Sequence, residues 1–257
     1  MLEIPDYQRR TYEKTNLSRV VFQWRFSPIL RLRQGLSPDL QERWRQTYPI
    51  YESRSYKLEG DRAEVGKAPA LAHRLADADV HWEWDIREDS LTFICNQYSG
   101  WEQESEHFES FARSFWEEYE PAYISRVGLR YQDVLERLGE SSPAIWQKYL
   151  RSELSGWFAN GLSATAMRLS EQQLFLDHEA GTIRLGLEAK TGHTYEGEPA
   201  QRLDMDFDMF RAGLKDDFGG AWERMEAFHD ALVGLFEWTI TDELRDEMSV
   251  QGEQEAT

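Results

Sequence analysis

Three aspartates in the C-terminal third of the chain have a spacing that could support chemistry. Asp204, Asp206 and Asp208 alternate with apolar residues, and this period of two predicts a strand that carries the three carboxylates on one face. Converging carboxylates bind Mg²⁺ or Mn²⁺ and can support phosphoryl chemistry. Successive side chains on one strand face are about 7 Å apart, so a single ion would need ligands from elsewhere. Alternation alone also produces a solvated face above a buried one, and we favour that interpretation.

Arginines on neighbouring strands are the expected partners of these aspartates. Arg126 and Arg130 share one face of a predicted strand, and Arg168 and Arg184 lie in other strand-like segments. Three like charges on one strand face are unfavourable unless cations on adjacent strands relieve them. We therefore expect an ion-pair ridge between arginines and aspartates, with an anion or partner site on the arginines as the alternative.

Other familiar site patterns are weak or absent. His81, Glu83 and Asp85 also alternate and imitate metal ligands, but any amphipathic strand shows this spacing. The single cysteine, Cys95, lies in an apolar strand pattern and is predicted to be buried. The chain has no Gly-x-Gly-x-x-Gly, phosphate loop, His-Glu-x-x-His or Cys-x-x-Cys. We expect no cofactor, and no metal site beyond the aspartates.

A candidate interface lies on a short predicted helix that carries Arg43, Trp44 and Arg45. Tryptophan next to arginine can stack on single-stranded bases or anchor a protein interface. The alternative is a tryptophan-rich core whose flanking arginines extend to solvent, because a long cationic side chain buries its stem and keeps its charge in water.

Composition bounds the class of protein. The chain has 257 residues, a formal charge of −18 and 13% aromatic residues. Such a charge repels phosphate backbones and anionic lipid, so we expect neither direct duplex nucleic-acid binding nor membrane binding. The aromatic content supports a packed globular core. With no secretory pattern and no long apolar run, we expect a cytoplasmic protein.

The elements that would position these residues predict an α+β fold. Strands are predicted at residues 20–26, 80–86, 91–98 and 124–131 and in several segments between 165 and 210, with a loop at 60–79. Two helices carry apolar stripes at helical spacing. Their members are Phe108, Phe111 and Phe115 in the first helix and Met225, Phe228 and Leu232 in the second. We expect antiparallel sheet with helices on one face.

The domain organisation is expected to follow this order of elements. We predict a first α+β half at residues 1–140, a second at 141–241 and a frayed acidic tail at 242–257. Both halves have strands followed by an aromatic-striped helix, which suggests two pseudo-repeated βαβββα-like units. Short strands and amphipathic helices also produce such similarity by chance.

Two longer motifs resemble a known family. Tyr123-Ile-Ser-Arg-Val-Gly-Leu-Arg-Tyr131 and Leu235-Phe-Glu-Trp-Thr-Ile-Thr-Asp-Glu-Leu244 are similar to those of a sporadically distributed prokaryotic family of about 250 residues and unknown function, which has no catalytic signature to carry over. Its patchy distribution resembles that of genes in defence or toxin–antitoxin loci. The resemblance implies a partner-binding role.

The sequence therefore favours a non-enzymatic protein-binding or regulatory module in a prokaryotic defence or toxin–antitoxin setting, with another protein as its partner. The main alternative is a metal-dependent hydrolase or nuclease that uses Asp204, Asp206 and Asp208. A small-ligand sensor is the third hypothesis. The sequence leaves the oligomeric state open.

Overall fold

The computed structural model describes residues 2, 4, 9–56, 70–156, 158 and 166–254. The chain divides into two compact units, each made of segments that are distant in sequence. Unit 1 contains Met1–Ser18, Arg130–Met209 and Ala227–Thr257, and unit 2 contains Arg19–Leu129 and Phe210–Glu226. The expected boundary at residue 140 falls within unit 1, and the division into halves at that residue stays a prediction.

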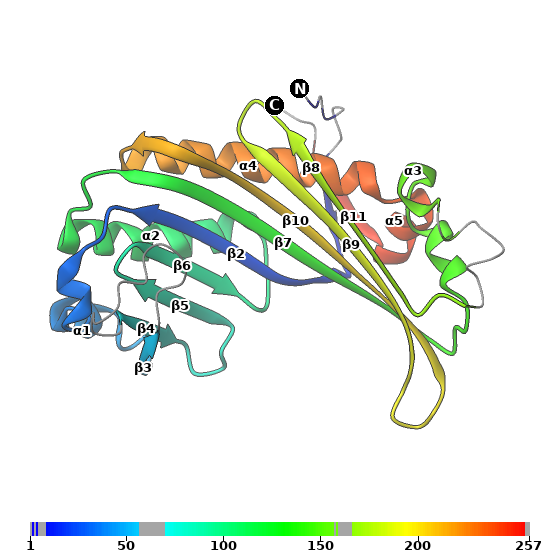
Figure 1. The fold of residues 1–257 in the computed structure, drawn as a ribbon, viewed down its shortest axis with the longest axis horizontal. Coiled ribbons are helices and arrows are strands. Elements are labelled where there is room, and N and C mark those ends of the chain that lie inside the picture. The colour runs from blue at the N-terminus through cyan, green and yellow to red at the C-terminus, as the bar shows by residue number, and fades with distance from the viewer. Residues whose placement is uncertain are drawn as a thin grey trace, which may run out of the picture. The chain divides into compact units, whose positions relative to one another are not determined.

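The described residues form a nine-stranded sheet with the order β3-β4-β5-β6-β2-β7-β10-β9-β8 and a two-stranded sheet of β1 and β11 (Figure 1). The strands are β1 (Arg9–Tyr12), β2 (Leu17–Phe26), β3 (Ile50–Tyr56), β4 (Ala70–Ala76), β5 (Trp82–Arg87), β6 (Ser90–Cys95), β7 (Ile124–Leu138), β8 (Leu169–Asp177), β9 (Thr182–His193), β10 (Pro199–Asp216) and β11 (Val250–Gln254). The helices are η1 (Leu30–Arg33), α1 (Pro38–Trp44), α2 (Trp101–Tyr119), η3 (Pro143–Lys148), α3 (Ser152–Ser155), α4 (Phe218–Thr239) and α5 (Asp242–Met248). The predicted α+β class with a large antiparallel sheet is confirmed.

The strand order follows the same pattern on both sides of the central pair β2 and β7. On one side β6, β5 and β4 follow β2, and on the other β10, β9 and β8 follow β7. In chain order each series ends in a long helix, α2 or α4. The place outside β4 is taken by β3, whereas no strand of the described residues takes the equivalent place outside β8. Residues 157 and 159–165, between α3 and β8, lie outside the described part of the chain.

Unit 2 is organised by aromatic side chains between α2 and the sheet. Phe108 of α2 stacks on Phe22 of β2 with ring centroids 5.1 Å apart, and Phe111 stacks on Trp84 of β5 at 4.1 Å. Phe115 packs on Phe26 of β2. All of these rings are buried, because the helical spacing of the stripe turns its members to one side. The first predicted stripe is therefore part of the hydrophobic core.

The second predicted stripe is buried as well. In unit 1, Phe228 and Leu232 of α4 are buried, and Phe236 meets Phe207 of β10 edge to face at 5.9 Å. Met225, the stripe residue of α4 that belongs to unit 2, is also buried. Both stripes are therefore part of the hydrophobic core.

Residues 242–254, expected as a frayed tail, form α5 and β11, and β11 pairs with β1. Buried Glu237 of α4 explains the order of this segment. Its carboxylate accepts from Tyr12 Oη at 2.6 Å and from Arg245 Nε at 3.0 Å. Arg245 also donates to the Glu237 and Ile240 carbonyls at the end of α4. A buried carboxylate is costly without a cation, so Arg245 holds α5 against α4.

The segment predicted as a loop at residues 60–79 contains β4 in its described part. β4 pairs with β3 on one side and β5 on the other, and these contacts outweigh the weak strand preference of its alanines. Its buried His73 bonds to the Leu32 carbonyl at 2.8 Å and the Tyr51 hydroxyl at 3.1 Å. Residues 60–69 lie outside the described residues.

Truncating the aromatic core tests the packing of unit 2. Phe111→Ala should lower the free energy of unfolding by about 3–5 kcal/mol, because it leaves a cavity among large rings. Ser110→Ala, at the exposed neighbouring position, serves as the control and should change little. Urea denaturation measures both, and equal midpoints for Phe111→Ala and the wild type would contradict this packing.

Candidate functional site

The predicted ion-pair ridge forms around Asp206, on β10 between β7 and β9. Arg130 of β7 donates from Nε to Asp206 Oδ1 at 2.6 Å and from Nη2 to Oδ2 at 2.8 Å. Arg184 of β9 reaches Asp206 Oδ2 at 2.8 Å and Asp208 Oδ2 at 3.3 Å. The hydrogen bond to Asp206 is the main cause that raises the pKa of Arg130. Two carboxylates of the ridge are thus neutralised by cations on both flanking strands.

The remaining members of the predicted site are arranged differently. Asp204 bonds to Arg202 of its own strand at 2.7 Å. Arg126 donates to Gln23 Oε1 at 2.7 Å, and its guanidinium lies 4.9 Å from the centre of the Phe210 ring. Arg168 precedes β8, and its carbonyl accepts from the Thr191 amide at 3.0 Å.

As a whole the ridge is a charge-paired sheet face. A metal ion there would have to displace arginines that already satisfy the carboxylates, at the cost of leaving those arginines unpaired. The chemistry that the ridge supports best is therefore cross-strand stabilisation of β7, β10 and β9.

The predicted interface on α1 is split between core and surface. Trp44 packs on Phe111 at 5.3 Å and on Tyr48 at 5.8 Å. Arg43 pairs with Glu117 of α2 at 3.2 Å, and Arg45 pairs with Glu42. The tryptophan thus packs against other aromatic residues of unit 2, and its two flanking arginines lie on the surface.

The alternating set His81, Glu83 and Asp85 does not meet. Glu83 accepts from Arg74 Nε at 2.6 Å, and Asp85 accepts from Arg87 Nε at 2.6 Å. His81 lies instead in the turn before β5, where its carbonyl accepts from the Asn96 amide at 2.7 Å. The alternating spacing therefore suggested one site, although these residues bond to different neighbours.

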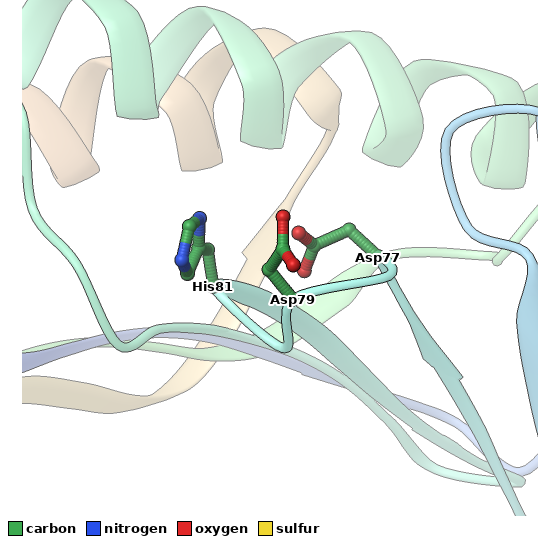
Figure 2. Close-up of side chains that lie close together, drawn as sticks. All are labelled: Asp77, Asp79 and His81. Atoms are coloured by element: carbon green, nitrogen blue, oxygen red, sulfur yellow. The ribbon is translucent and has the colours of Figure 1, made fainter.

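The turn before β5 brings Asp77, Asp79 and His81 together (Figure 2). One ligand atom from each lies within 4.8 Å of the others, and two carboxylates with an imidazole can hold a divalent ion. Asp77 Oδ1 already accepts from the Trp82 amide at 2.7 Å, and Val80 adopts a left-handed φ of 58°. Exposed acidic groups are common without an ion, so the turn itself accounts for this cluster.

Polar groups at the base of this turn are fully engaged. Buried Glu104 of α2 accepts from Trp82 Nε1 at 2.8 Å and from Ser99 Oγ at 2.6 Å. His107 stacks on the Trp82 ring at 4.1 Å and bonds to the Tyr48 hydroxyl. Burial lowers the pKa of His107 and raises that of Tyr48. These groups therefore form a structural network in which burial disfavours the charged forms of His107 and Tyr48.

The outer edge of β8, on the side away from β9, carries backbone groups that point away from the described sheet. In the hairpin that follows β8, His178 and Gly181 exchange both amide-to-carbonyl bonds, at 2.9 and 3.2 Å. Pairs along an antiparallel ladder alternate between bonded and non-bonded, and the β8 to β9 register is continuous. The even-numbered residues of β8 therefore bond to β9, and the odd-numbered ones point their N–H and C=O outward.

Four odd residues define this outer edge, namely Leu169, Glu171, Gln173 and Phe175. Within the described ranges, the outward groups of these four have no backbone partner. Asp177, the next in the series, accepts from the Leu2 amide at 2.7 Å, which confirms that the odd carbonyls face outward. The edge is thus ready to pair with an extended segment.

Apolar side chains flank the outer edge of β8. Leu169, Leu174 and Phe175 are 52%, 43% and 63% exposed. β8 contains no lysine, no proline and no bulge, which are the usual protections of a sheet edge. Sequence reasoning found a strand here but missed its edge position, because alternation reveals a face and not which strands lie alongside.

Asp133 on β7 is a buried carboxyl of unit 1. It is 5% exposed, and burial raises its pKa to about 7. Tyr131 and Leu135, at the neighbouring positions on the same strand face, are also buried. The charged form is therefore disfavoured in the folded state.

Replacing one carboxylate of the ridge tests the ion pairs. Asp206→Asn should lower the free energy of unfolding by about 1–3 kcal/mol at pH 7, because two arginines lose a charged acceptor. Denaturant unfolding with and without Mn²⁺ measures the effect, with Asp246→Asn at an exposed site as the control. Unchanged or higher stability without metal would refute the structural role.

Asp133 predicts a pH dependence with a defined sign. Because its folded pKa lies above the unfolded value of about 3.9, its contribution to stability is complete below that value and is lost as pH rises through about 7. Asp133→Asn should therefore be more stable than the wild type at pH 8, by about 2–4 kcal/mol, and the difference should shrink toward pH 4. Urea unfolding across this range measures it, and a constant difference would show that Asp133 does not titrate this way.

No protein-family model matches the chain, and no curated protein matches it. Among the described residues, no helix is both long and apolar enough to cross a membrane. The family resemblance of the two motifs stays a prediction, and the functional argument rests on the residues themselves.

Proposed function

We propose that this chain is a non-enzymatic protein-binding module that takes an extended segment of a partner protein as an added strand on the outer edge of β8. The observation that carries the proposal is the row of outward backbone groups at Leu169, Glu171, Gln173 and Phe175. In strand addition, main-chain bonds supply affinity, and side chains on alternate positions supply specificity.

The repeated strand order supports the same place. β3 covers β4 in the first series of strands, and β8 is the outermost strand of the second (Figure 1). An added segment outside β8 would complete the second series in the way that β3 completes the first. Leu2 already bonds to Asp177 on this side of β8, so an outward carbonyl of this edge can accept from a backbone donor.

Side chains at the outer edge of β8 define the chemistry of the partner. Phe175 and Leu169 share one face of β8 with Glu171, while Leu174 lies on the other. A segment with apolar residues beside lysine or arginine would cover the rings and pair with Glu171. The chain's charge of −18 also favours a basic partner segment over nucleic acid.

The alternative functions have less support. A hydrolase that uses Asp204, Asp206 and Asp208 would need an ion to displace Arg130 and Arg184 from the carboxylates. The setting in prokaryotic defence or toxin–antitoxin loci stays a prediction that rests on the family resemblance. A binding module fits such a setting without requiring chemistry.

Two adjacent glutamines provide a matched test of which backbone groups face outward. Gln173→Pro removes an outward N–H and should change the free energy of unfolding by no more than about 1 kcal/mol, because proline is tolerated at a free strand edge. Gln172→Pro removes a bond to β9, and with it the bond from Gln172 Nε2 to the Leu154 carbonyl, and should cost on the order of 2–3 kcal/mol. Equal costs in urea unfolding would contradict the assignment of the outer edge.

Binding itself is tested with a synthetic ten-residue peptide of alternating valine and lysine. It should slow hydrogen exchange at the Glu171, Gln173 and Phe175 amides of the wild type, and Gln173→Pro should abolish this protection. With wild type and Gln173→Pro as paired baits in host lysate, the partner should be retained only by the wild type. A peptide that leaves these amides unprotected, together with identical captured proteins, would contradict the proposal.

A further inference from the structure

We propose that, when no other partner is present, the outer edge of β8 pairs with the same edge of a second copy of this chain, in an antiparallel two-fold arrangement centred on Gln172. The inference rests on the proposed function, because it names an occupant of the same edge. Closed two-fold pairing is the commonest way in which identical chains associate.

The position of the outward groups selects this register. Centred on Gln172, Leu169 faces Phe175 of the second copy, and Glu171 faces its Gln173. All four residues of the outer edge are then used, with about eight backbone hydrogen bonds between the copies. Asp177 remains outside the paired region and keeps its bond to Leu2.

Neighbouring registers are disfavoured by charge or by overlap. A pairing centred on Glu171 would place that carboxylate opposite its own copy, and one centred on Leu174 would place Glu171 opposite Asp177. Like charges directly opposite each other destabilise a strand pair. Pairings centred on Gln173 or Phe175 extend to Asp177, where the carbonyl already accepts from Leu2.

Side chains also complement each other in the chosen register. The exposed Phe175 ring and Leu169 side chain cover one another twice across the two-fold axis, and such aromatic to aliphatic pairs stabilise adjacent strands. The two chains carry −18 each, so they repel at long range. Salt screens this repulsion beyond about 8 Å at physiological ionic strength, and the dimer should therefore strengthen as salt is raised.

Cysteine cross-linking measures the register directly. Glu171→Cys and Gln173→Cys place single thiols on exposed positions of one strand face. The native Cys95 is buried, and burial raises its pKa to about 12, so it does not compete. In the proposed dimer, residue 171 of one copy lies about 5.5 Å from residue 173 of the other, within disulfide range. Identical positions lie about 8–9 Å apart, beyond it.

The expected result is a disulfide between the two variants when they are mixed, one of them isotopically labelled, and little disulfide when each is oxidised alone. A predominant disulfide between two copies of the Gln173→Cys variant would overturn the register. Gln173→Pro should convert the dimer to monomer in sedimentation, and a wild-type dimer that dissociates as NaCl rises would also overturn the proposal, because ion pairs would then hold it.

A second measurement separates this inference from the function on which it rests. If the wild type sediments as a monomer at high concentration but the valine–lysine peptide protects the β8 amides, the dimer is refuted and strand binding stands. If the chain is monomeric and the peptide gives no protection, both fail.

Discussion

Backbone pairing is the constraint on which the rest of this structure depends. Every N–H and C=O taken from water must find a partner, and the strands between β3 and β8 find theirs on both sides. Among the residues that the structure describes, this pairing stops on one side of β8, with the exception of the bond between Leu2 and Asp177. In β8, backbone groups that bond to β9 alternate with backbone groups that point outward. The outward groups can pair with a further strand.

Charge is distributed in a way that keeps this acidic chain folded. Several buried or half-buried carboxylates are matched by arginine, as at Glu237 with Arg245 and at Asp206 with Arg130 and Arg184. Guanidinium groups suit this role because their planar fork binds carboxylates at two points. The acidic residues that might have formed a reactive centre are thereby used to join strands and helices.

Much of the fold could be predicted from periodicity, because alternation and helical stripes record burial directly. β2, the ridge of Asp204, Asp206 and Asp208, and the stripes of α2 and α4 were all recognisable in this way. The sequence also indicated that arginines would pair with the ridge. It could not say which of the candidate arginines would reach Asp206, because that choice depends on which strands become neighbours and on the register between them.

The other features that the sequence did not predict also depend on tertiary contacts. The acidic segment that forms α5 is ordered by buried Glu237 through Arg245. Asp77, Asp79 and His81 meet only because a turn folds them together. The outer edge of β8 has no sequence signature at all, since edge position is a property of the whole sheet.

Residue-resolved hydrogen exchange on β8, in dilute protein without partner, tests the central claim most directly. The account predicts fast exchange at the amides of Leu169, Glu171, Gln173 and Phe175, alternating with slow exchange at Ser170, Gln172, Leu174 and Leu176, since only the second set bonds to β9. Slow exchange at all eight amides in a monomer would contradict it, because the chain itself would then already cover the outer edge of β8.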